Sequence, residues 1–136
     1  GTMAKLVNVE GIGEAYAEKL KAAGVGTTQA LLEKGSTPAG RQEIAEMADV
    51  SPKLVLEWVN HVDLFRVKGI GEEYADLLEE AGVDTVPELA QRNAENLYQK
   101  LQEVNQEKKL VRRPPSQAEV SDWVAQAQEL PRKITY

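Results

Sequence analysis

The chain contains an internal repeat, and this duplication limits its possible folds more than any other feature. Nineteen residues from Val9 recur 58 positions later, from Val67, and twelve of the nineteen are identical. A sequence that repeats at a fixed interval folds as successive copies of one structural unit. We therefore predict two related units in this chain of 136 residues, at 5–66 and 67–130.

Few residues lie outside these units. Gly1 and Thr2 precede Met3, so we interpret 1–4 as a tag remnant with the N-terminus, and 131–136 as a C-terminal tail. Each unit has only about 60 residues, which is near the lower limit for an independent hydrophobic core. We expect the two units to share hydrophobic surface and to pack closely.

The positions shared by the two copies predict their local structure. In each copy, two glycines flank one isoleucine, as Gly11-Ile12-Gly13 and as Gly69-Ile70-Gly71. Glycine permits a tight turn with positive φ and a close approach of the backbone to another surface, and the isoleucine can enter the core. Apolar residues at helical spacing follow each turn. Gly24 and Gly82, each before a valine, then predict Schellman helix endings.

The rest of each unit predicts further short helices. No alternating β-branched run is longer than Lys5–Val9, so we expect an all-α fold with four helices in each unit. In the helix that begins near Pro38, we expect Ile44, Met47 and Ala48 to share one buried face. Hydroxyl or amide side chains mark the expected starts of helices: Thr27, Thr37, Ser51, Thr85, Asn93 and Ser116.

The second unit carries an insertion that the first lacks. Trp58 and Trp123 become equivalent if seven residues are inserted in the second unit, and the insertion falls at 106–115. Such a segment can contact phosphate, an acidic protein partner or the acidic Glu72–Glu88 stretch of a neighbouring copy, or it can serve only solubility. It contains the one concentrated basic cluster of the chain, a basic loop with Lys108, Lys109, Arg112 and Arg113.

The tract from Val67 to Leu78 resembles the helix-hairpin-helix motif, in which an apolar-x-Gly-apolar-Gly turn precedes an alanine and a large aliphatic residue. Continued to Val86, it also resembles the C-terminal domain of the RNA polymerase alpha subunit and the N-terminal domain of recombinases. From Lys5 to Leu130, the chain resembles an uncharacterised bacterial family of tandem helix-hairpin-helix domains. The resemblance implies that hairpin amides and the next helix N-terminus hold a phosphate, and that hairpin carbonyls can hold a monovalent cation. The residues concerned are Gly11, Ile12, Gly13, Lys68, Gly69, Ile70 and Gly71.

The charges around the hairpins depart from that family. Its members often place Lys or Arg just inside the second helix, whereas this chain has Glu14 and Ala15 in one copy and Glu72 and Glu73 in the other. The net charge is −6, and carboxylates repel the phosphates that supply most nonspecific DNA affinity. One acidic helical face can bind a divalent cation or a basic partner, or remain solvated: Glu72, Asp76, Glu79 and Glu80.

Several kinds of chemistry are not expected. With no cysteine and one histidine, His61, the chain lacks the ligands of a zinc site and a recognisable catalytic triad. Neither Gly-Ile-Gly turn completes a nucleotide-binding loop, so we expect no metal, no cofactor and no enzymatic activity. No apolar run approaches the length of a membrane span, and the lack of cysteine fits the reducing cytoplasm.

Two functions remain after these exclusions. We expect a non-catalytic interaction or scaffold module that binds a protein partner, and the charge pattern is also compatible with self-association. The alternative is sequence-independent nucleic-acid binding through the hairpin amides and the basic loop, 108–113. A salt titration of DNA binding separates the two, because affinity that depends on phosphate contacts falls steeply as salt rises.

Overall fold

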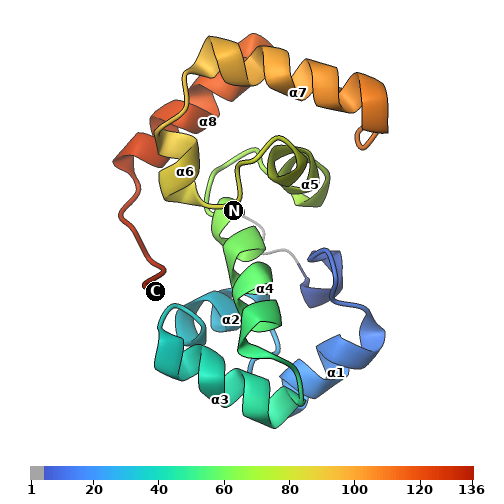
Figure 1. The fold of residues 1–136 in the computed structure, drawn as a ribbon, viewed down its shortest axis with the longest axis vertical. Coiled ribbons are helices and arrows are strands. Elements are labelled where there is room, and N and C mark those ends of the chain that lie inside the picture. The colour runs from blue at the N-terminus through green and yellow to red at the C-terminus, as the bar shows by residue number, and fades with distance from the viewer. Residues whose placement is uncertain (1–4) are drawn as a thin grey trace. The chain divides into compact units, whose positions relative to one another are not determined.

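The computed structural model describes residues 5–136, so the expected tag remnant at 1–4 lies outside the described residues. Over this range the chain is all-helical and has no strand, which confirms the predicted all-α class. None of the helices in 5–136 combines the length and the apolar character needed to cross a lipid bilayer. The elements in chain order (Figure 1) are the 3-10 helix η1 (Leu6–Asn8), α1 (Glu14–Ala22), α2 (Thr28–Lys34), α3 (Pro38–Ala48), α4 (Pro52–Leu64), α5 (Glu72–Glu80), α6 (Val86–Ala90), α7 (Ala94–Lys108) and α8 (Gln117–Glu129).

Contacts within the chain divide it into two compact units. Unit 1 runs to Asp63 and also contains Lys133–Tyr136, whereas unit 2 is Leu64–Arg132. The chain therefore passes from unit 1 to unit 2 after Asp63 rather than after the expected Arg66. Part of the expected C-terminal tail packs with unit 1 instead of standing apart from both units.

The helix boundaries follow from the capping residues. Val25 donates its backbone N–H to the carbonyl of Leu20 at 2.9 Å, and Val83 does the same to Leu78 at 2.8 Å. With Gly24 and Gly82 at positive φ, these bonds confirm the predicted Schellman endings of α1 and α5. Each predicted start residue accepts a backbone N–H in its side chain and so caps a helix: Thr27, Thr37, Ser51, Thr85, Asn93 and Ser116.

Each unit buries aliphatic side chains together with one tryptophan. Trp58 of α4 is 1 % exposed in unit 1, and Trp123 of α8 is 2 % exposed in unit 2. One core prediction is wrong, because Met47 of α3 is 58 % exposed. The buried face of α3 has the expected helical spacing but begins with a charged residue; it consists of Arg41, Ile44, Ala45 and Ala48.

Candidate functional site

The two glycine turns have the same geometry in both units. The N–H of Ile12 donates to the carbonyl of Val9 at 3.0 Å, and the N–H of Ile70 donates to that of Val67 at 3.2 Å. Gly11 and Gly69, the third residues of these turns, have φ of 89° and 98°, as a type II turn requires. Both isoleucines are buried. We call the two turns hairpin 1, Val9–Gly13, and hairpin 2, Val67–Gly71.

The second glycine of each hairpin has a different role from the first. Gly13 and Gly71 are the N-cap residues of α1 and α5, in extended backbone. The first backbone bond within α5 runs from the N–H of Ala75 to the carbonyl of Gly71, so the preceding amides have no helical acceptor. A surface hollow opens beside these amides, lined by Gly69, Gly71, Glu72, Glu73 and Tyr74.

A tryptophan from the last helix of each unit covers the first glycine of the hairpin. A Cβ added at Gly11 would lie 3.2 Å from Nε1 of Trp58, and one at Gly69 would lie 3.0 Å from Nε1 of Trp123. The indole rings also contact tyrosines that follow the hairpins. The Tyr16–Trp58 ring centroids are 5.3 Å apart and those of Tyr74–Trp123 are 5.1 Å apart, with similar tilts of 57° and 54°. The two tryptophans thus occupy equivalent places, as the assumed insertion requires.

Hairpin 2 is held by a glutamine that the sequence did not single out. Oε1 of Gln126 accepts the backbone N–H of Lys68 at 2.9 Å, and its Nε2 donates to the Lys68 carbonyl at 3.0 Å. The same Nε2 donates to Asp122 at 2.8 Å. Gln126 lies one helical turn after Trp123, on the same face of α8. This position is the sequence feature that could have indicated its contact with hairpin 2. The backbone N–H and carbonyl of Lys68 are therefore both bonded to Gln126, while the side chain of Lys68 is exposed.

The expected acidic face of α5 is only partly available. Asp76 is half-buried, whereas Glu72, Glu79 and Glu80 are exposed. Glu80 forms an ion pair with Lys108 of the basic loop. Glu72 and its neighbour Glu73, by contrast, have no ion pair among the described residues. The available negative charge therefore lies at the start of α5, beside the hollow of hairpin 2.

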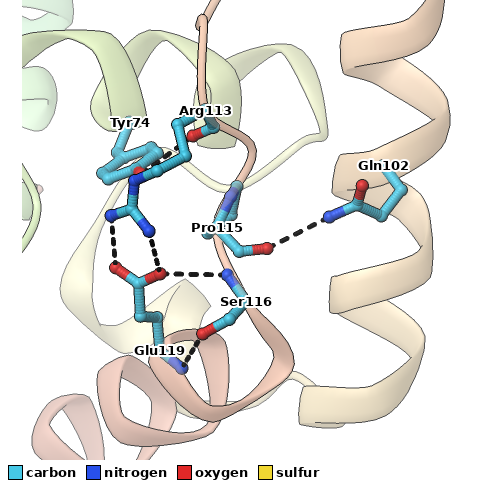
Figure 2. Close-up of polar contacts among 6 residues, drawn as sticks. All are labelled: Tyr74, Gln102, Arg113, Pro115, Ser116 and Glu119. Carbon is cyan, nitrogen blue, oxygen red and sulfur yellow. Dashed lines mark hydrogen bonds and ion pairs between the residues drawn. The ribbon is translucent and has the colours of Figure 1, made fainter.

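The basic loop is anchored within unit 2, as Figure 2 shows. Arg113 makes two contacts with the carboxylate of Glu119, at 3.2 and 3.3 Å, and its carbonyl accepts the hydroxyl of Tyr74 at 2.9 Å. Bonds from the Ser116 backbone and from Arg113 hold the pKa of Glu119 below its usual value. Burial raises the pKa of Tyr74. Arg113 is therefore ion-paired in place, although its side chain is 73 % exposed.

Two side-chain amides of α7 hold the loop and the residues that follow it. Asn105, buried near the end of α7, donates to the carbonyl of Val111 at 3.1 Å and accepts its N–H at 2.9 Å. Gln102 donates to the carbonyl of Pro115 at 3.1 Å (Figure 2). Among the four basic side chains, Lys109 and Arg112 are exposed and have no ion pair within the described residues. All four basic side chains are thus exposed, but Lys108 and Arg113 are ion-paired and only the other two are left without an ion pair.

The remaining sequence candidate, His61, lies on α4 of unit 1 and is 3 % exposed. It occupies the place in unit 1 that Gln126 occupies in unit 2, three residues after the tryptophan. One of its ring nitrogens lies within 4.8 Å of a carboxylate oxygen of Glu10 in hairpin 1, so His61 is buried beside that hairpin.

Comparison with known proteins places the chain in a family. Residues 10–130 match the model of a family described as a domain of unknown function, DUF4332, and the chain belongs to that family. The match extends over most of both units, all of hairpin 2 and all of hairpin 1 except Val9. This confirms the expectation of an uncharacterised family. No solved structure matches the chain.

Proposed function

We propose that each unit is a four-helix module of the helix-hairpin-helix type. The support is the repeated set of contacts: a type II turn with glycine at its third position, a buried isoleucine, a glycine N-cap and a tryptophan over the turn. A module of this kind presents unpaired backbone amides at the start of the helix after the hairpin. The side chains around those amides then decide what binds there.

We propose that the chain is a non-catalytic interaction module, and that its partner is a protein surface rich in lysine and arginine. The observation that carries this proposal is the hollow of hairpin 2, where Glu72 and Glu73 stand beside the open amides. A helix N-terminus is equivalent to about half a positive charge. Two full carboxylate charges exceed it, so the hollow is attractive to ammonium and guanidinium groups and repels phosphate.

The same residues favour binding over catalysis. The hollow is lined by glycine backbone, two exposed carboxylates and Tyr74, whose hydroxyl already donates to the Arg113 carbonyl. None of these groups is a nucleophile with an adjacent general base. The absence of cysteine suits a reducing compartment, and we place the module in the cytoplasm under this proposal.

A charge reversal at hairpin 2 tests the proposed partner class. The variant Glu72→Lys/Glu73→Lys is expected to bind a labelled peptide rich in Lys and Arg about tenfold more weakly than the unaltered chain. Fluorescence anisotropy at low salt measures the affinity. The matched control is Glu95→Lys/Glu103→Lys on α7, which makes the same change in net charge at exposed positions. Equal loss in both variants would mean that only net charge matters and would refute a site at hairpin 2.

A second function is favoured by a separate observation. Lys109 and Arg112 have no ion pair within the described residues, and the three acidic residues around hairpin 1 are offset by three nearby lysines, Lys5, Lys19 and Lys21. The alternative is therefore sequence-independent nucleic-acid binding through the amides of Gly11 and Gly13 and the two free cations of the basic loop. This alternative requires binding that weakens with salt, because counterions are released from the phosphates.

Substitution of the free cations tests the alternative. If it holds, Lys109→Glu/Arg112→Glu reduces the slope of log affinity against log salt by about 0.9 for each phosphate that is no longer neutralised. The control Lys53→Glu/Lys100→Glu, at exposed positions outside the loop, keeps the slope. Arg113 is left intact because it pairs with Glu119. No binding to duplex or single-stranded DNA at low salt removes this alternative, whereas the peptide experiment is unaffected.

A further inference from the structure

The segment Ile134–Tyr136 is held on unit 1 by specific backbone contacts. The N–H of Thr135 donates to the carbonyl of Ser36 at 2.8 Å, and its hydroxyl donates to the same carbonyl at 3.2 Å. Ile134 is 3 % exposed. These residues form no helix, and the segment lies as an irregular peptide against the α2–α3 connection. In Figure 1 the chain end lies beside that connection.

Arg41 of α3 completes this docking site. It is 5 % exposed and donates to the carbonyls of Gly35 at 2.8 Å and of Thr135 at 2.7 Å. Its guanidinium also lies 5.9 Å from the ring centroid of Tyr136. Within the described residues Arg41 has no carboxylate partner. A buried guanidinium needs acceptors for its donors, and Ile134–Tyr136 supplies one of the two that it has.

We propose that this corner of unit 1 is a docking site for the Ile134–Tyr136 segment of a second copy of the chain, which gives a dimer by exchange of the segment. The bonds join residues that are 94 and 99 positions apart, so they do not depend on chain connectivity. The preceding residues, 131–133, are exposed and outside any helix. A second copy offers the same isoleucine, the same Thr135 groups and the same aromatic ring, and exchange of an identical element is a common route to dimers.

Concentration decides which copy supplies the segment. A segment tethered to its own site competes at an effective concentration of about a millimolar for a short flexible connection. Exchange is therefore expected at protein concentrations near a millimolar, and after refolding at high concentration. Dilution returns the segment to its own chain. The inference concerns a different surface from hairpin 2 and does not rest on the proposed function.

Cross-linking between two different variants tests the exchange. The chain has no cysteine, so Ser36→Cys in one preparation and Thr135→Cys in a second, carrying a mass tag, introduce one thiol each. The backbone N–H of Thr135 bonds to the carbonyl of Ser36 at 2.8 Å, so the two residues are direct neighbours, as disulfide formation requires. The two variants are unfolded and refolded together near a millimolar under mild oxidation. Non-reducing electrophoresis is expected to show a mixed dimer that is at least tenfold weaker near a micromolar.

A third variant separates docking from random oxidation. Adding Ile134→Asp to the Thr135→Cys chain puts a charge into the buried position and is expected to abolish the mixed dimer. Circular dichroism checks that the helices remain. Light scattering on the unaltered chain, refolded near a millimolar, is expected to detect a dimer that a peptide of sequence 131–136 dissociates. Absence of the mixed dimer, its persistence with Ile134→Asp, or a monomer under all conditions would each overturn the proposal.

Discussion

Trp123→Ala is expected to lower the free energy of unfolding of unit 2 by about 3–5 kcal/mol, the range for removing a buried tryptophan. Trp123 is 2 % exposed, covers Gly69 and packs against Tyr74. Its removal leaves a cavity against backbone that cannot collapse freely, because hairpin 2 is also fixed by Gln126. Chemical denaturation followed by circular dichroism measures the change.

The same variant reports on the other unit. The chain has two tryptophans, so Trp58 is the sole indole reporter after Trp123 is removed. If the units unfold separately, the fluorescence of Trp58 keeps its denaturation midpoint. The part of the circular dichroism change that comes from unit 2 then shifts to lower denaturant. The control Met47→Ala, at a side chain 58 % exposed, is expected to change stability by about 0.5 kcal/mol or less. A decrease below about 1 kcal/mol for Trp123→Ala would contradict the packing of this indole against hairpin 2.

The repeat predicted the parts of the fold that depend on short stretches of sequence. Capping residues, Schellman glycines and hairpin turns are decided within four or five residues, and the sequence located them correctly. The equivalence of Trp58 and Trp123 in their two units followed from comparing the two copies. These features needed no knowledge of which helices meet.

The prediction failed where a distant contact changes the role of a residue. Arg41 lies on the buried face of α3 because Gly35 and Thr135 supply acceptors, and the second of these is 94 positions away. A prediction that assigns only apolar residues to the core excludes Arg41 and includes Met47 in its place on the buried face of α3. Gln126 was missed for the same reason, since its partner Lys68 is 58 positions away.

The candidate site shows this limit most clearly in its charges. The sequence identified both the acidic face and the basic loop, but the contact considered between them was with the acidic stretch of a neighbouring copy. In unit 2 they meet, because Lys108 pairs with Glu80. Arg113 likewise pairs with Glu119. What remains for a partner is smaller and better defined: Glu72 and Glu73 at hairpin 2, and Lys109 and Arg112 on the loop.

The two glycines of hairpin 2 are expected to respond very differently to valine. Gly69→Val is expected to lower the free energy of unfolding by about 3 kcal/mol, because a β-branched residue is strained at positive φ and overpacks its surroundings. Gly69 has φ of 98°, and its added Cβ would lie 3.0 Å from Nε1 of Trp123. Gly71→Val is expected to cost about 1 kcal/mol or less, the loss of a favourable N-cap residue.

Gly71 tolerates a side chain because it faces open space. Its backbone is extended, and an added Cβ would meet no atom within 4 Å. Urea denaturation of both variants measures the difference, and Gly11→Val with Gly13→Val repeats the comparison in unit 1. An equal decrease in the free energy of unfolding for Gly69→Val and Gly71→Val would contradict the distinction between the two positions.

The contrast also separates folding from binding at the proposed site. A valine at Gly71 occupies the hollow beside the open amides while the helices of unit 2 stay intact. Gly71→Val is therefore expected to weaken binding of the Lys- and Arg-rich peptide without a matching decrease in stability, whereas any weakening in Gly69→Val is confounded by unfolding. Binding that is unchanged in folded Gly71→Val would exclude the hollow of hairpin 2 as the contact surface.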